Sequence, residues 1–301
     1  MGPTPQGDAA QVAARGSPRG HRRAAGSSPA LNPTPHAAAA PAARRTALVT
    51  GASSGIGEAF AAEFAAHGFD LVITARRTER LRATAECLER EHGVHVDVIS
   101  CDLAADGAAA ALCARIARDG RTVDALVNCA GFGVAGRFTG ADWTVHEAML
   151  RLTVSAPTEL AYRLLPGMAE RGYGRIVNVA SLAGLVDSGA GALYGAAKTY
   201  GVSLSTSLAR EVSAHGIHVT AVCPGLTRTE FHDAPALRAS VRAMPHWMWM
   251  DPATVARQGY AAVMDARPVL VNGRANWLFV ALLRVVPRRL LAALGRIARR
   301  R

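Results

Sequence analysis

The stretch TALVTGASSGIG, residues 46–57, joins a short apolar run to a glycine-rich turn, and an Ala-rich helical pattern continues from it to His67. Glycines let a backbone turn sharply and approach a pyrophosphate. The N-terminus of the next helix then offers free N–H groups and a partial positive charge. The cluster stands between an expected strand and an expected helix, as this mechanism requires. The stretch therefore predicts a dinucleotide-binding unit; a turn that uses glycine only for steric reasons is the alternative.

Short apolar runs and longer helical patterns keep alternating after this unit. The expected strands are residues 46–50, 70–75, 95–101, 125–130, 175–181 and 218–224, and the expected helices are residues 55–67, 79–91, 105–118, 143–171 and 194–215. Strands that alternate with helices form βαβ units, and strands that are apolar almost throughout are buried on both faces. The sequence predicts an α/β fold with a single Rossmann-type, doubly wound parallel sheet of about seven strands.

The basic residues lie mainly towards the two ends of the chain, whose 301 residues have a net charge of +11. Residues 1–45 hold six arginines and one acid, and residues 266–301 hold nine arginines and no acid. Residues 46–265 carry 19 bases and 22 acids, so nucleic-acid binding by a folded core is not supported. Three parts follow: a Pro/Ala/Arg-rich tail over 1–45, a Rossmann-fold domain over 46–265, and a basic amphipathic tail over 266–301.

The two tails allow different interpretations. Residues 1–45 have no apolar periodicity and are expected to be disordered, although their Arg-rich, acid-poor composition also resembles an organelle transit peptide. The apolar run 276–286 is too short to span a bilayer, and Pro287 interrupts it. With its arginines this tail could contact an anionic membrane surface; packing against its own domain is the alternative.

The five cysteines are scattered and never spaced as C-x-x-C. An odd number in such positions argues against a disulfide framework and against a zinc site, so no metal is expected. This cysteine usage fits a reducing compartment, and a cytoplasmic location is the expectation.

The second expected strand ends at Thr74-Ala75-Arg76-Arg77. An enzyme that selects NAD usually places Asp or Glu here to hold the ribose 2′-hydroxyl, whereas an arginine can hold a 2′-phosphate. Ala75 followed by Arg76 therefore predicts NADP(H) in preference to NAD(H), with Arg76 as the phosphate ligand. The alternative is that both arginines are solvated residues at a helix start.

Tyr194 and Lys198 lie four residues apart in an expected helix, after Ser181 at the end of the fifth expected strand. This spacing puts both side chains on one helix face. A phenol has a pKa of about 10, too high for acid–base chemistry at neutral pH, and a neighbouring ammonium favours the phenolate and lowers that pKa. The pair suits a general acid or base, with Ser181 hydrogen-bonding a substrate oxygen beside the phenol.

Lysine usage supports this interpretation. Of the 34 basic residues in the chain, Lys198 is the sole lysine and all others are arginines. A compact ammonium whose pKa shifts readily differs from a guanidinium wherever acid–base chemistry is required. An exposed helical lysine is the alternative, and it does not explain why the lysine follows Tyr194 by one helical turn.

Together these motifs resemble the short-chain dehydrogenase/reductase family over about residues 44–265. The matching elements are TGASSGIG at 50–57, Asp102-Leu103, Asn128-Cys129-Ala130-Gly131, Ser181, Tyr194-x-x-x-Lys198, and Pro224-Gly225 with Thr229. The resemblance implies an NAD(P)-dependent oxidoreductase that acts on CH–OH groups by hydride transfer to or from the nicotinamide. It also implies a homodimer or homotetramer.

The resemblance further implies residue roles. Ser181, Tyr194 and Lys198 would be catalytic, with Lys198 also holding the nicotinamide ribose. Asp102 would contact the adenine, and Asn128 would support the central strands. With Arg76 included, the expected cofactor-binding residues are Gly51, Ser53, Ser54, Gly55, Ile56, Gly57, Arg76, Asp102, Leu103, Asn128, Ala130, Tyr194, Lys198, Pro224, Gly225, Thr227 and Thr229, and the expected substrate contacts are Ser181 and Tyr194.

One position departs from the family pattern. The family usually has an Asn in the helix after the NAG strand, where it holds a water that relays protons to the lysine. Aligning MLRLTVSAPTEL with that helix puts Thr153 at this position. A threonine hydroxyl can hold a water but offers fewer hydrogen bonds. Thr153 is therefore a candidate catalytic residue in a relay that is weakened, rerouted or absent. Cys129 also replaces a family Asn, and is expected to be a small buried apolar residue.

Between Thr229 and Pro252, where the family usually carries its substrate loop, residues 231–251 read FHDAPALRASVRAMPHWMWMD. The large apolar residues of this segment could line a pocket, and core packing or a subunit contact are the alternatives. We expect an apolar carbonyl or alcohol substrate. Two functions stay open: an NADP(H)-dependent oxidoreductase of carbonyls and secondary alcohols, and a cofactor-sensing binding protein that has lost turnover. The intact Ser181, Tyr194 and Lys198 favour the enzyme, and only Thr153 favours the binding protein.

Overall fold

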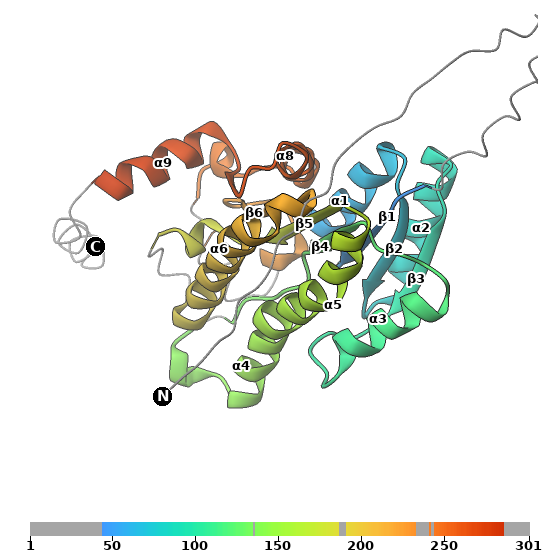
Figure 1. The fold of residues 1–301 in the computed structure, drawn as a ribbon. Coiled ribbons are helices and arrows are strands. Elements are labelled where there is room, and N and C mark those ends of the chain that lie inside the picture. The colour runs from blue at the N-terminus through green and yellow to red at the C-terminus, as the bar shows by residue number, and fades with distance from the viewer. Residues whose placement is uncertain (1–43, 135, 187–190, 233–240, 242–243, 286–301) are drawn as a thin grey trace, which may run out of the picture. The chain divides into compact units, whose positions relative to one another are not determined.

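The computed structural model describes residues 44–134, 136–186, 191–232, 241 and 244–285 (Figure 1). Within these residues seven parallel strands form one sheet in the order β3-β2-β1-β4-β5-β6-β7. The strands are β1 Thr46–Thr50, β2 Asp70–Ala75, β3 Val96–Ser100, β4 Ala125–Asn128, β5 Gly174–Val179, β6 Ile217–Cys223 and β7 Val269–Val271. The order reverses between β1 and β4, so the predicted doubly wound α/β fold is confirmed.

Helices cover both faces of the sheet. They are α1 Gly55–Ala66, α2 Thr78–His92, α3 Ala108–Arg118, α4 Trp143–Leu150, α5 Ala156–Glu170, α6 Ala192–Val212, α8 Pro252–Met264 and α9 Arg274–Val285. Residues of α1, α2 and α8 share one buried cluster with the strands, and residues of α3, α5 and α6 share a second. Each face of the sheet is therefore closed by its own helical layer.

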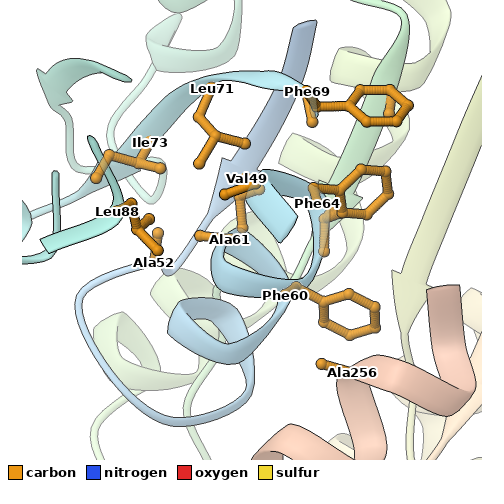
Figure 2. Close-up of a cluster of buried hydrophobic side chains, with 14 of the residues drawn as sticks. Val49, Ala52, Phe60, Ala61, Phe64, Phe69, Leu71, Ile73, Leu88 and Ala256 are labelled. Carbon is orange, nitrogen blue, oxygen red and sulfur yellow. The ribbon is translucent and has the colours of Figure 1, made fainter. Parts of the chain in front are cut away.

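The first of these clusters fixes the position of α1. Phe60 and Phe64 are fully buried, and Figure 2 shows Phe60 directed toward Ala256 of α8. Burying a side chain of this size contributes about 1.5–3 kcal/mol to folding. Because α1 follows the glycine turn directly, its packing also fixes the turn.

The seventh strand lies outside the domain range expected from the sequence. β7 pairs in parallel with β6, with Leu270 opposite Val222. The sheet therefore extends past residue 265, and that boundary is corrected. β7 has only three residues, so the apolar run was too short to be recognised as a strand.

The helix expected over residues 143–171 is interrupted in its middle. Residues Arg151–Ser155 form a π-helical turn between α4 and α5, in which the N–H of Ala156 bonds the carbonyl of Arg151, five residues back. Pro157 has no N–H with which to continue a regular α-helical ladder. Thr153 lies inside this wider turn.

Parts of the two predicted tails lie outside the described residues, namely 1–43 and 286–301. In the described part of the C-terminal tail, α9 exposes Trp277, Leu278 and Leu282 by 60% or more. None of the helices in the described residues has the length and apolar character needed to cross a membrane.

Candidate active site

The candidate site lies at the carboxyl ends of β1 and β4, where the strand order reverses. Thr50 joins these two ends. Its Oγ1 accepts hydrogen bonds from the backbone N–H groups of Cys129 at 3.0 Å and Ala130 at 3.1 Å, and it donates to the carbonyl of Val127 at 3.2 Å. The glycine turn after β1 and the loop after β4 are therefore held in a fixed relation.

Close packing inside the turn requires glycine at two positions. A Cβ on Gly57 would lie 2.2 Å from the carbonyl oxygen of Gly51. Gly51 itself has φ +70°, and a Cβ there would lie 2.9 Å from the backbone of Ala130. Ser54, at the N-cap of α1, makes no capping hydrogen bond with its side chain, so N–H groups at this helix start stay available to an anion. The turn fits a dinucleotide pyrophosphate.

Ser181, Tyr194 and Lys198 come together beyond the end of β5. Ser181 follows this strand, Tyr194 lies in the first turn of α6, and Lys198 lies one turn further. The hydroxyl of Ser181 lies near enough to the phenol of Tyr194 to lower the pKa of that phenol. The Nζ of Lys198 donates to the carbonyl of Val179 at 2.7 Å and lies 5.7 Å from the centre of the Tyr194 ring. The three residues expected to act together thus form one compact group.

Burial controls the protonation of this group. It raises the pKa of Tyr194 to about 12, while the nearby hydroxyl of Ser181 lowers the pKa by less. Burial also lowers the pKa of Lys198. We expected the neighbouring ammonium to lower the phenol pKa, and this expectation is corrected: desolvation is the largest cause of the shift and raises the pKa, while the Nζ of Lys198 lies 5.7 Å from the centre of the ring. The phenol is therefore held protonated at neutral pH.

A cavity of about 20 Å³ lies beside Lys198 and borders the position that departs from the family pattern. Its polar lining comes from Asn128, Thr153, Asn178, Lys198 and Tyr200. A cavity of this volume can hold one water molecule. The hydroxyl of Thr153 donates to the carbonyl of Met149 at 2.6 Å, so it has only lone pairs left to offer a water. Thr153 therefore stands where the relay residue was expected, with less hydrogen-bonding capacity than an Asn.

Asn128 belongs to a buried polar chain that joins β4, β5 and α6. Its Nδ2 donates to Oδ1 of Asn178 at 2.8 Å, and Nδ2 of Asn178 donates to Oγ of Ser205 at 2.9 Å. The Oδ1 of Asn128 is buried and accepts no hydrogen bond from any described residue. Asn128 thus supports the central strands, as the resemblance implied, and leaves one acceptor beside the cavity.

The glycine turn is contacted by Arg77, the neighbour of the expected phosphate ligand Arg76. The guanidinium of Arg77 donates to Oγ of Ser53 at 3.0 Å and to Oγ of Ser54 at 2.7 Å. Arg76, the expected phosphate ligand, is exposed, and no hydrogen bond or ion pair joins its side chain to another described residue. The structure therefore brings Arg77, and not Arg76, to the two serines of the turn.

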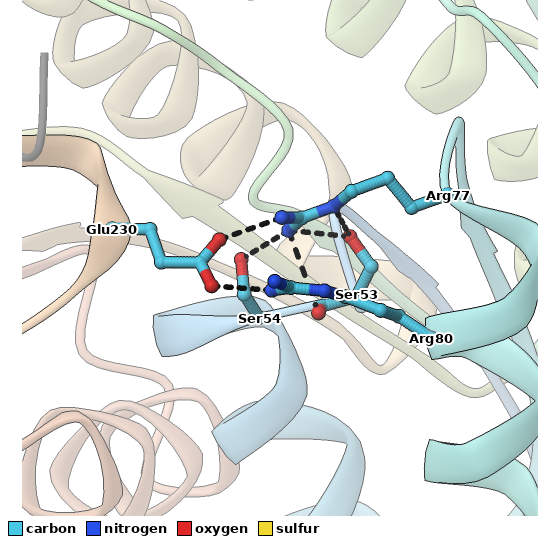
Figure 3. Close-up of polar contacts among 5 residues, drawn as sticks. All are labelled: Ser53, Ser54, Arg77, Arg80 and Glu230. Carbon is cyan, nitrogen blue, oxygen red and sulfur yellow. Dashed lines mark hydrogen bonds and ion pairs between the residues drawn. The ribbon is translucent and has the colours of Figure 1, made fainter.

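A second arginine and an acid complete this group (Figure 3). Arg80 lies one turn along α2 from Arg77, and both pair with the carboxylate of Glu230. The hydrogen bonds from Arg80 and Arg77 lower the pKa of Glu230 to about 2. The spacing of the arginines, three residues apart at a helix start, is the sequence signal that could have identified them.

The segment after β6 reaches both ends of the candidate site. Thr229 packs over Gly55: a Cβ on Gly55 would lie 2.8 Å from the methyl carbon of Thr229. Phe231 lies with its ring centre 5.8 Å from that of Tyr194, whereas Trp247 is 74% exposed. The remaining expected cofactor residues follow nearby elements: Asp102 and Leu103 come after β3, Ala130 after β4, Pro224, Gly225 and Thr227 after β6, and Ile56 lies in the first turn of α1.

Comparison with known proteins places this geometry in a family. A family model described as short chain dehydrogenase matches residues 45–236. Sulfoacetaldehyde reductase of Chromohalobacter salexigens is 37% identical over 192 residues, which cover 61% of this chain and 73% of that protein. The NADP-dependent 3-hydroxy acid dehydrogenase of Salmonella typhi is 34% identical over 189 residues, which cover 61% of this chain and 73% of that protein.

Solved structures agree with the sequence comparison. A short-chain dehydrogenase from Sphingobium yanoikuyae in complex with NADPH superposes with a TM-score of 0.70 at 33% identity, covering 82% of this chain and 95% of that one. The bulky-bulky ketone specific alcohol dehydrogenase of Comamonas testosteroni superposes with a TM-score of 0.68 at 30% identity, and the match covers 82% of this chain and 94% of that one. These relatives favour the enzyme over the non-catalytic binding protein. The chain belongs to the short-chain dehydrogenase family and is an oxidoreductase that acts on CH–OH groups.

Proposed function

We propose that the protein interconverts an apolar ketone and its secondary alcohol with NADP(H), and that Tyr194 is the general acid or base. The observation that carries this proposal is the compact group of Ser181, Tyr194 and Lys198. A hydroxyl beside a buried phenol, with a lysine one helical turn away, suits proton transfer to or from an oxygen atom.

The nicotinamide of the bound cofactor supplies or accepts the hydride. In the reducing direction, Tyr194 donates its phenolic proton to the carbonyl oxygen of the substrate. Ser181 hydrogen-bonds the same oxygen and holds it beside the phenol. Lys198, fixed by its hydrogen bond to the carbonyl of Val179, stabilises the phenolate that is formed. In the oxidising direction the phenolate removes the alcohol proton.

The basic group at the end of β2 supports NADP(H). Ala75 stands where an NAD-selective protein has an acid, and the guanidinium of Arg77 already contacts both serines of the glycine turn. The relative from Sphingobium yanoikuyae is an NADPH complex. Calorimetric titration of the wild type with NADP⁺ and with NAD⁺ tests the preference, and equal affinities would contradict it.

Two variants then identify the phosphate ligand. We expect Arg77→Ala to weaken NADP⁺ binding about tenfold or more and to leave NAD⁺ binding unchanged, because a charge-assisted hydrogen bond is lost. Arg76→Asp is expected to reduce selectivity by placing a negative charge near the same phosphate. If only Arg76→Asp changed the selectivity, Arg77 would be excluded as the ligand.

The surroundings of Tyr194 favour an apolar substrate. The ring of Phe231 lies against it, and the Comamonas testosteroni relative is specific for bulky ketones. NADPH consumption should be compared for aryl ketones, sulfoacetaldehyde and 3-oxo acids at matched concentrations. We expect a higher kcat/KM on the aryl ketones; a higher value on either acidic substrate would contradict the apolar assignment.

A further inference from the structure

Glu230 is held by two guanidinium groups at once (Figure 3). Its Oε2 lies 2.6 Å from Nη1 of Arg77, and its Oε1 pairs with Nη1 of Arg80. These two hydrogen bonds hold the carboxylate ionised well below its ordinary pKa. The two oxygens of one carboxylate thus bridge residues that are 150 and 153 positions away in the sequence.

The two arginines stand where a phosphate monoester beside the glycine turn would be held. Arg77 also donates to the hydroxyls of Ser53 and Ser54, so the carboxylate is held by two guanidinium groups, one of which is bound to the glycine turn. Arginine binds carboxylates and phosphates through the same planar array of donors. Glu230 therefore makes the contacts that a 2′-phosphate would make.

Glu230 also belongs to the segment that contacts the candidate catalytic tyrosine. Its neighbour Thr229 packs over Gly55 of the turn, and its neighbour Phe231 lies with its ring centre 5.8 Å from that of Tyr194. Three consecutive residues therefore contact the cofactor turn, the arginine pair and the tyrosine. Along the chain these three contacts are at most two peptide units apart.

We propose that Glu230 is an internal competitor for the 2′-phosphate of NADP(H), and that its displacement by the phosphate releases residues 229–231 beside Tyr194 for substrate. The inference rests on the proposed use of NADP(H). NAD(H) has no 2′-phosphate and leaves the pairs of Glu230 with Arg77 and Arg80 in place. The pairing of Glu230 with Arg77 and Arg80 thus makes the substrate end of the site respond to which cofactor is bound. Since linkage is reciprocal, a ligand that displaces Phe231 strengthens NADP⁺ binding.

Binding of the oxidised cofactors to Glu230→Gln tests the competition. Removing the carboxylate charge frees both arginines without a change of shape. We expect NADP⁺ to bind about fivefold more tightly than to the wild type, the magnitude of two exposed ion pairs, and NAD⁺ affinity to stay the same. Glu79→Gln is the matched control: it removes a negative charge beside Arg80 but breaks only the pair with Arg82. Unchanged NADP⁺ affinity in Glu230→Gln, or an equal gain in Glu79→Gln, overturns the competition.

Hydrogen–deuterium exchange tests the coupling to residues 229–231 without any turnover. In the wild type saturated with each cofactor, we expect faster amide exchange across these residues with NADP⁺ than with NAD⁺. In Glu230→Gln the two cofactors should give the same exchange rates, because the ion pairs with Arg77 and Arg80 are already lost. Equal exchange with both cofactors in the wild type overturns the coupling. Cofactor preference is read from wild-type affinities alone, so its failure is distinguishable from failure of this inference.

Discussion

Thr50 and Thr74 lie side by side in the sheet and allow a matched test of the site's scaffold. They are register partners in β1 and β2, and they are 1% and 0% exposed. Thr50 makes three hydrogen bonds through Oγ1, whereas Oγ1 of Thr74 has no partner among the described residues. The same substitution, threonine to valine, therefore removes three hydrogen bonds at one position and none at the other.

The two substitutions are expected to change the free energy of unfolding in opposite directions. Thr50→Val leaves the N–H groups of Cys129 and Ala130 without their acceptor, and an unsatisfied buried donor costs about 1–3 kcal/mol, so we expect a loss of about 2–4 kcal/mol. Thr74→Val removes a buried hydroxyl that has no partner, and we expect a gain of about 0.5–1 kcal/mol. The side-chain volume is nearly the same in both variants, so packing does not account for the difference.

Urea denaturation of the wild type and the two variants measures these effects. With m unchanged, the midpoint should fall for Thr50→Val and rise for Thr74→Val. If Thr50→Val were as stable as Thr74→Val, the role of Thr50 in joining β1 to β4 would be wrong.

Three further predictions concern the site. Gly57→Ala should lower stability by about 1–3 kcal/mol and weaken NADP⁺ binding, because its Cβ would lie 2.2 Å from the carbonyl oxygen of Gly51; unchanged calorimetric affinity would contradict the packing argument. Lys198→Arg should lower kcat about tenfold or more, because a guanidinium does not replace a buried compact ammonium; Arg210→Lys, exposed in the same helix, is the control and should retain activity. The pKa of Tyr194 is raised to about 12, so the protonated phenol needed for reduction is fully present at lower pH and is lost only as pH approaches that value. Reductive kcat/KM should therefore stay flat from about pH 6 to 9, while oxidation, which needs the phenolate, rises with pH; a reductive rate that falls in this range would contradict the assignment.

The parts of the fold that could be predicted are those with a local signal. Five of the six strands expected from the sequence read as mainly apolar runs because they are buried almost throughout, whereas β3, at the edge of the sheet, buries only Val96. The glycine turn and the Tyr194–Lys198 spacing could be read locally in the same way. β7 could not, since a run of three apolar residues is too short to show a strand pattern.

The rest depends on tertiary contacts that no local pattern contains. The pairing of Glu230 with Arg77 joins residues 153 positions apart, and only the fold brings them together. The pKa of Tyr194 is another case: the neighbouring Lys198 could be inferred from spacing, but the desolvation that raises this pKa depends on how α6 packs beside β5.

The central claim, that Tyr194 donates the proton to the substrate oxygen, is tested most directly by single-turnover reduction of an aryl ketone with bound NADPH. The comparison is between the wild type and Tyr194→Phe, after NADPH affinity has been measured for both. We predict equal affinity and a rate of NADPH oxidation about 10²–10⁴-fold slower in the variant. Equal rates in the two proteins would contradict the claim.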